Sequence, residues 1–167
     1  MSSRLLQDDV DSISAFIGSD RHLVPMPGSG KTTPGNLWGP KLICDTLHSN
    51  GMGAGVLTML ERRNAVPKSA FAAPGERPTV QTHFDSMAAH ADLTTPTKIT
   101  LVDDVLTKGS TMMGAARRIW SVLPNADIVG FAVFRTRNLD PDITSVVEPV
   151  IGTLRYSEDT DEVFRID

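Results

Sequence analysis

The chain has 167 residues, 40% of them hydrophobic and 22% charged, a composition that argues against a disordered, collagen-like or coiled-coil protein. Its net charge of -4 argues against a protein that grips duplex DNA by neutralising many phosphates. A single cysteine, Cys44, rules out an internal disulfide and a cysteine-cluster zinc site, and it favours a cytoplasmic location.

The length predicts a single domain spanning residues 1–167. No membrane association is expected, because the longest stretch without Asp, Glu, Lys or Arg, residues 46–60, is shorter than the roughly 20 apolar residues that span a bilayer. Acidic residues stand where the apolar core of a secretory signal would lie, so no export segment is expected.

Apolar periodicity predicts the elements in chain order. The first half of the chain is expected to contain an amphipathic helix over residues 3–17, a buried strand over 22–26, a Pro- and Gly-rich loop over 27–35, and helices over 36–50 and 54–63. Residues 64–80 carry scattered prolines and no period, which is typical of a lid or a disordered loop. The second half is expected to contain a short helix over 81–91, strands over 98–102, 127–134 and 146–154, and a helix over 110–123. Near-continuous apolar strands that alternate with helices predict an α/β fold with a mainly parallel sheet.

The segment around residues 99–111 carries the strongest functional signal. A buried strand leads to Asp103 and Asp104, at the strand end where ligands bind in open α/β sheets. Small and hydroxylated residues around Gly109 then lead into a helix, so backbone N–H groups and the helix dipole can receive a phosphate. Two carboxylates beside such a loop can accept hydrogen bonds from sugar hydroxyls or orient a hydrated Mg²⁺. The pattern therefore predicts a site for a phosphorylated sugar.

This segment resembles the binding motif for 5-phosphoribosyl 1-pyrophosphate (PRPP) of the type I phosphoribosyltransferase family, over Val102-Asp103-Asp104-Val105-Leu106-Thr107-Lys108-Gly109-Ser110-Thr111. The resemblance implies a central, mainly parallel sheet flanked by helices, with a small hood and a mobile lid loop. It also implies an enzyme that transfers the 5-phosphoribosyl group from PRPP to a nitrogen or other nucleophile, releases pyrophosphate, depends on Mg²⁺ and pairs as a homodimer. The acceptor is not identified.

By position, the resemblance implies a role for each matching residue. The catalytic pair Asp103 and Asp104 would hold the ribose hydroxyls, with Mg²⁺ bound near them through PRPP and no protein ligand of its own. The 5-phosphate loop would consist of Thr107, Lys108, Gly109, Ser110 and Thr111. The pyrophosphate loop would consist of Met26, Pro27, Gly28 and Ser29. The lid region would offer Arg62, Arg63, Lys68 and Arg77.

Within the family, the ComF-type branch is the most similar, through Val24-Pro25-Met26-Pro27, residues 60–81, Asp103-Asp104 and residues 131–137. The chain departs from that branch in a longer Ala- and Pro-rich insertion before Gln81 and in lacking an N-terminal zinc module. Lys108 replaces a smaller residue. Thr107 stands where the hypoxanthine and guanine enzymes place an Asp, which argues against a 6-oxopurine acceptor.

Two other functions fit parts of the sequence. A non-catalytic sensor or ComF-like accessory module could keep a pocket for PRPP or a nucleotide. A P-loop nucleoside triphosphatase is suggested by Gly28-Ser29-Gly30-Lys31-Thr32, but Pro25 stands where the first P-loop glycine belongs. The four histidines, His22, His48, His83 and His90, show no zinc-site spacing, and each is interpreted as a surface or partly buried histidine.

Overall fold

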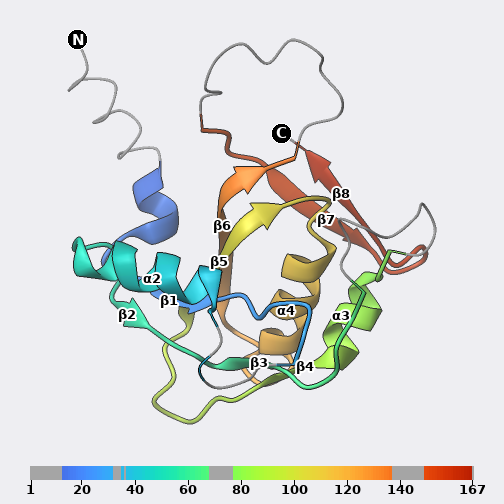
Figure 1. Ribbon diagram of the computed structural model, residues 1–167, viewed down its shortest axis with the longest axis horizontal. Helices are drawn as coiled ribbons and strands as arrows, with labels where there is room; N and C mark the ends of the chain where they lie inside the picture. The colour runs from blue at the N-terminus through green and yellow to red at the C-terminus, as the bar shows by residue number, and fades with distance from the viewer. Residues whose placement is uncertain (1–12, 32–34, 36, 68–76, 137–148, 167) are drawn as a thin grey trace.

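A four-stranded parallel sheet forms the centre of the computed structural model, which describes residues 13–31, 35, 37–67, 77–136 and 149–166 (Figure 1). The strand order is β2 (Gly55–Val56), β1 (His22–Pro25), β5 (Lys98–Leu106) and β6 (Asp127–Arg135). Val24 lies opposite Leu101, which lies opposite Gly130 on β6. The predicted α/β class with a mainly parallel sheet is confirmed.

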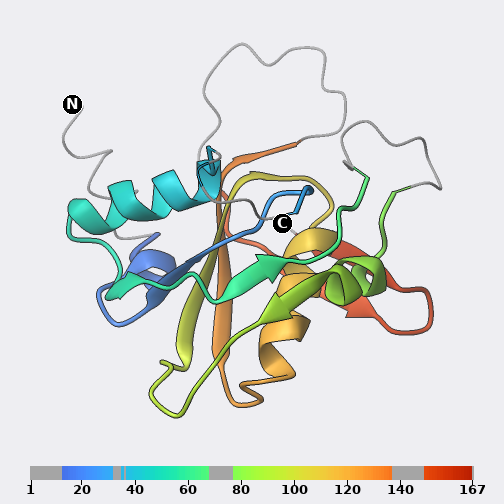
Figure 2. The ribbon, with the colours of Figure 1, turned by 60° about the horizontal axis from the view of Figure 1, so that its bottom comes forward.

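Helices cover both faces of this sheet, which is why β1 and β5 are nearly continuous apolar runs. On one face, Leu23 and Val102 pack with Ile17 of the helical residues 13–17 and with Cys44 of α2 (Gly39–Ser49). On the other face, a larger core gathers around α4 (Ser110–Trp120). Figure 2 shows α2 and α4 on opposite sides of β5 and β6.

Two antiparallel strand pairs and a short helix complete the fold. One pair joins β3 (Leu60–Arg62) to β4 (Met87–Ala89), which follows α3 (Val80–Ser86) directly. The other is the C-terminal hairpin of β7 (Thr153–Ser157) and β8 (Glu162–Ile166). The hairpin is attached to α3 and α4 by polar contacts: Arg117 donates to the Tyr156 hydroxyl at 3.0 Å, and the Gln81 amide donates to the Asp161 carboxylate at 3.1 Å.

Some element predictions are wrong. Residues 54–63 form β2 and β3 and not a helix, because Leu60 and Arg62 point inward, Glu61 points outward, and the segment pairs with β4. The helix expected over 81–91 ends at Ser86, and the strand expected over 146–154 begins only at Thr153. Residues 3–12 of the first predicted helix and residues 146–148 of the last predicted strand lie outside the described residues. None of the helices in the described part of the chain is long and apolar enough to cross a membrane.

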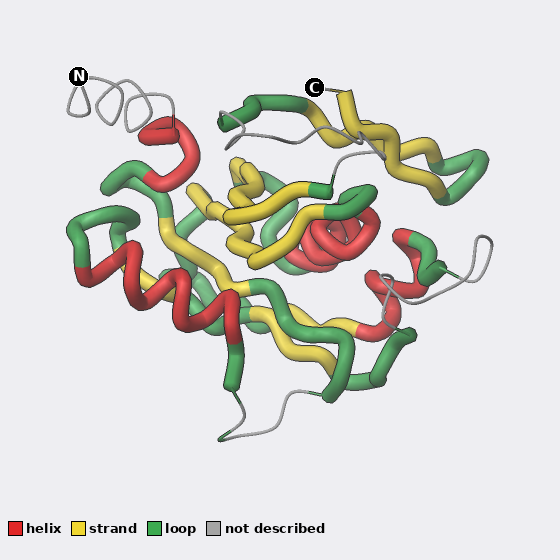
Figure 3. Tube along the Cα trace, turned by 45° about the horizontal axis from the view of Figure 1, so that its top comes forward, coloured by secondary structure: helices red, strands yellow, loops and turns green. Residues whose placement is uncertain are grey.

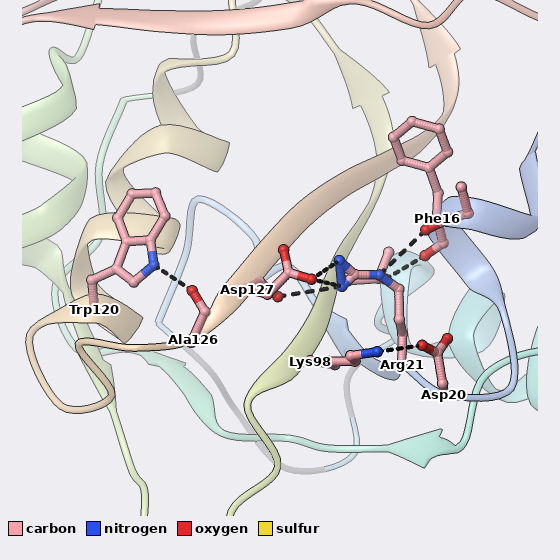
Figure 4. Close-up of polar contacts among 9 residues, drawn as sticks. Phe16, Asp20, Arg21, Lys98, Trp120, Ala126 and Asp127 are labelled. Atoms are coloured by element: carbon pink, nitrogen blue, oxygen red, sulfur yellow. Dashed lines mark hydrogen bonds and ion pairs between the residues drawn. The ribbon is translucent and has the colours of Figure 1, made fainter.

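Polar contacts tie together the amino ends of the strands (Figure 4). The Arg21 side chain is only 7% exposed and donates to the Asp127 carboxylate at 2.7 and 3.1 Å. Its Nε also donates to the backbone oxygen of Ala15 at 3.3 Å. Lys98 and Asp20 form a second, exposed pair at 2.8 Å. The start of β1 is thereby joined to the start of β6, at the edge opposite the carboxyl ends of the strands.

We expect Arg21→Ala to lower the free energy of unfolding by about 1–3 kcal/mol, because it removes a buried cation with several hydrogen bonds. Urea denaturation measures the change. Lys98→Ala is the control, since exposed ion pairs contribute little, and should leave the midpoint nearly unchanged. Equal midpoints for both variants and the wild type would show that the Arg21 contacts do not stabilise the fold.

Candidate functional site

The two loops predicted to bind phosphates follow neighbouring strands of the sheet. β1 and β5 lie side by side, and the Met26 amide donates to the Val102 carbonyl at 2.8 Å just beyond the end of β1. The sheet continues from β1 to β2 on one side and from β5 to β6 on the other side. Ligands of open α/β sheets bind at the carboxyl ends of strands where the connections diverge in this way. The structure therefore brings residues 26–29 and 107–111 to the same edge (Figure 3).

Each carbonyl group of the first loop, residues 26–29, accepts a hydrogen bond from another part of the protein. Trp38 Nε1 donates to the Met26 oxygen at 2.7 Å, and the Val66 amide donates to the Ser29 oxygen at 2.9 Å. Between them, Arg62 Nε donates to the Gly28 oxygen at 2.8 Å, with a longer contact of 3.5 Å from Nη2 to the Pro27 oxygen. These hydrogen bonds fix the orientation of the loop's peptide units.

The orientation of the carbonyls determines where the amides point. The described residues contain no cis peptide bond, so each N–H is antiparallel to the carbonyl of the preceding residue. The amides of Gly28, Ser29 and Gly30 therefore point away from the groups that hold the loop. Gly28 is exposed, and a Cβ built on it meets no atom within 4 Å. Successive amides that face open space can bind an anion.

Asp103 and Asp104 lie inside β5, which extends to Leu106, and not beyond the end of a strand as predicted. Neighbouring strand residues point to opposite faces. Asp103 accordingly lies on the α4 face, where Arg62 attracts it, whereas Asp104 Oδ2 is 3.7 Å from a Cβ built on Gly39 at the start of α2. Asp103 is partly buried and Asp104 is exposed. The two carboxylates are thus adjacent in sequence but not equivalent in environment.

Burial sets the titration of Asp103. It raises the pKa of the Asp103 carboxyl from the ordinary 3.8 to about 7, and the neighbouring Asp104 charge adds to the increase. The positive charge of Arg62 acts in the opposite direction but does not cancel it. Burial likewise lowers the pKa of Arg62 to about 10, so this guanidinium is still charged near neutral pH.

The second loop leads into α4 through Gly109, which has a φ of 95° and precedes the first helical residue. Arg165 on β8 donates to the Thr107 oxygen at 3.1 Å, so the antiparallel Lys108 amide points away from the hairpin. No side chain caps the start of α4, whose first amides lack partners within the helix. Ser110 and Thr111 are its first two residues, and the Lys108 side chain is exposed.

The described residues among those proposed for the lid differ in exposure. Arg62 is 1% exposed and holds the first loop from below, so it is an interior residue and not a lid residue. Arg63 and Arg77 are exposed, and Lys68 lies outside the described residues.

His83 is the residue that sequence reasoning missed. It is 2% exposed and contacts both Arg62 and Thr111. Its three-residue spacing from the buried Val80 predicts an inward position on α3 but gives no sign of its polar partners.

Comparison with known proteins found no matching family model, no matching curated protein and no matching solved structure. Among the described residues, no group of three or more His, Cys, Asp or Glu side chains is arranged to hold a metal ion.

We expect Asp103→Asn to change how stability depends on pH. A raised pKa means that the folded state binds the proton more tightly, so this contribution is full below about pH 4 and is lost as the pH rises through about 7. The stability of the variant relative to the wild type should therefore increase by about 1–3 kcal/mol between pH 4 and pH 8. Urea denaturation across this range measures it, and a pH-independent difference would contradict the raised pKa.

We expect Gly109→Ala to lower the free energy of unfolding by about 1–3 kcal/mol. Its φ is one that other residues rarely adopt, and a Cβ there lies 2.8 Å from Cδ2 of Leu154 on β7. The contact is with the hairpin and not with the space expected for phosphate. Adding Leu154→Ala should relieve the clash but not the backbone strain, so the double variant should lose less than the sum of the single losses.

Proposed function

We propose that this protein is a phosphoribosyltransferase of the type I fold, which transfers the 5-phosphoribosyl group from PRPP to a nitrogen or other nucleophile and releases pyrophosphate. The observation that carries the proposal is that the two loops follow neighbouring strands, β1 and β5, at their carboxyl ends, with two carboxylates near the end of β5. A ligand with two phosphate groups separated by a sugar matches that order of donors and acceptors.

Each part of PRPP has a counterpart at this edge. The amides of Gly28, Ser29 and Gly30 suit the pyrophosphate, since the carbonyls of the same peptide units accept hydrogen bonds from Arg62 and Val66 on the opposite side. The uncapped start of α4 suits the 5-phosphate. The exposed Asp104 can accept hydrogen bonds from the ribose hydroxyls, and Asp103 would do so from the α4 face of β5.

The reaction breaks the bond between the anomeric carbon and the pyrophosphate oxygen and forms a bond from that carbon to the acceptor, which loses a proton. An oxocarbenium-like transition state needs stabilisation of the departing anion and correct positioning of the acceptor. Backbone amides supply the first of these, because fixed dipoles stabilise a developing charge without reorganising. This mechanism uses no covalent enzyme intermediate.

Mg²⁺ is the metal that this function requires. Carboxylate oxygens are ligands that Mg²⁺ accepts, and Asp104 is exposed on β5, so the residues present fit an ion held mainly by the pyrophosphate oxygens. When bound, Mg²⁺ neutralises charge on the leaving group.

The P-loop alternative is weakened by the backbone around Lys31. A P-loop leads directly from its strand into a helix at the lysine. Here residues 29–31 are not helical, and α2, the next helix in the described part of the chain, begins at Gly39. A non-catalytic sensor would use the same loops, so turnover is what separates it from an enzyme.

We expect Mg²⁺ with PRPP to raise the thermal unfolding midpoint. Ligand at about 100 times its dissociation constant adds roughly 2.7 kcal/mol, which corresponds to about 5–11 °C for a chain of this size. ATP with Mg²⁺ should give no comparable shift, and a shift with ATP alone would favour the P-loop function. Pyrophosphate release on addition of nucleobases or amines then identifies an enzyme, whereas binding without release identifies a sensor.

Asp104→Asn should weaken PRPP binding at least tenfold, because the exposed carboxylate loses its charge at the proposed ribose position. Isothermal titration calorimetry measures the affinity. Asp127→Asn is the matched control: it removes a carboxylate from the opposite end of the same sheet and should leave the affinity unchanged. Normal affinity in a folded Asp104→Asn protein would refute the site.

A further inference from the structure

His83 connects the two loops through the interior of the protein. Its Nδ1 is 3.5 Å from Arg62 Nη1, and its Nε2 is 3.2 Å from Thr111 Oγ1 at the start of α4. Arg62 in turn donates to the Gly28 oxygen in the first loop. A continuous chain of polar contacts thus runs from Gly28 through Arg62 and His83 to Thr111.

The chemistry of these groups fixes the direction of the hydrogen bonds. A guanidinium can only donate, so His83 Nδ1 must accept. Burial and the Arg62 charge lower the pKa of His83 to about 4, so the ring is neutral near pH 7 and carries one proton. That proton must lie on Nε2, which therefore donates to Thr111 Oγ1. The single hydroxyl hydrogen of Thr111 is then directed away from His83.

Packing of α3 against α4 holds the backbone from which the His83 side chain projects. The helices α3 and α4 approach closely at Gly114, where a Cβ would lie only 2.7 Å from the Cβ of His83. Ser86 donates to the His83 backbone oxygen at 2.8 Å and accepts from the same Arg62 nitrogen. Arg118 holds the end of α3 through the Phe84 oxygen at 2.8 Å. These contacts fix the backbone of α3 against α4 at His83.

We propose that His83 is a positioning residue, which orients the Thr111 hydroxyl as a hydrogen-bond donor to a sugar phosphate bound at residues 107–111. This inference rests on the proposed function, and it extends the site to a residue of α3 that does not itself contact the ligand. The Thr111 hydroxyl can both accept and donate a hydrogen bond. Because its oxygen accepts from the His83 ring, its hydrogen points away from the ring and donates to the phosphate.

A double-mutant cycle with ribose 5-phosphate as the probe tests this coupling. His83→Leu and Thr111→Val should each weaken binding about tenfold, and the double variant should be no weaker than either single variant, since both remove the same hydrogen bond. His83→Gln keeps an N–H donor and should recover most of the affinity. Losses that multiply to about a hundredfold, or no rescue by Gln, would overturn the proposal.

A second measurement does not depend on any variant folding. Long-range ¹H–¹⁵N NMR of the wild-type protein without ligand reports the tautomer of each histidine, assigned for His83 by its proximity to Thr111. We expect the Nε2–H tautomer for His83 at pH 7. The Nδ1–H tautomer or a protonated ring would overturn the inference.

The outcomes also separate this inference from the proposed function. If PRPP binds and Asp104→Asn abolishes binding while the cycle is additive, the function stands and the role of His83 is wrong. If the wild type binds neither PRPP nor ribose 5-phosphate, both proposals fail, whatever the tautomer.

Discussion

A guanidinium in the interior of a protein must find acceptors for its hydrogens, and Arg62 finds them in the backbone of the loop after β1. The arrangement of the site depends on this interaction. By accepting hydrogen bonds from Arg62, the Gly28 and Pro27 carbonyls turn inward, and the planarity of the peptide turns the following amides outward. Burial of the charge is offset partly by the attraction of Asp103, so the same residue interacts with both the first loop and Asp103 on β5. One buried cation therefore organises both donors and acceptors at this edge.

The second loop is held by a separate set of contacts. Arg165 binds the Thr107 carbonyl, and Leu154 packs where a Cβ on Gly109 would lie, so the C-terminal hairpin supports the loop from its outer side. Figure 3 shows this hairpin beside the end of α4 at which the loop lies. In both loops, arginine side chains donate hydrogen bonds to carbonyl groups. The amides of the same peptide units therefore point away from these arginines. Amides presented in this way would let a chain with a net charge of -4 form the proposed site for anions.

The parts of the fold that were predicted correctly depend on local pattern. Local apolar patterns identified β1, β5, α4 and β6. The apolar residues of each strand form a nearly continuous run, and those of α4 recur at helical spacing. The error at residues 54–63 arose because a strand as short as β3 has too few residues to show a period, and its pairing with β4 is decided by contacts 25 residues or more along the chain. The second strand of the hairpin, β8, was missed for a similar reason, since neither face of a two-stranded pair is fully buried.

The sequence by itself determined the α/β class and the positions of the two loops, because glycine, proline and hydroxylated residues after apolar strands act through local backbone geometry. Only the tertiary structure decided the roles of Arg62 and His83. Arg62 looked like a residue of a lid, and His83 like a surface or partly buried histidine, because nothing near either residue in the sequence reveals its partners. Their hydrogen bonds join residues 21 to 35 positions apart, and burial lowers the pKa values of both His83 and Arg62. Both effects arise only when the chain has folded and water has been excluded.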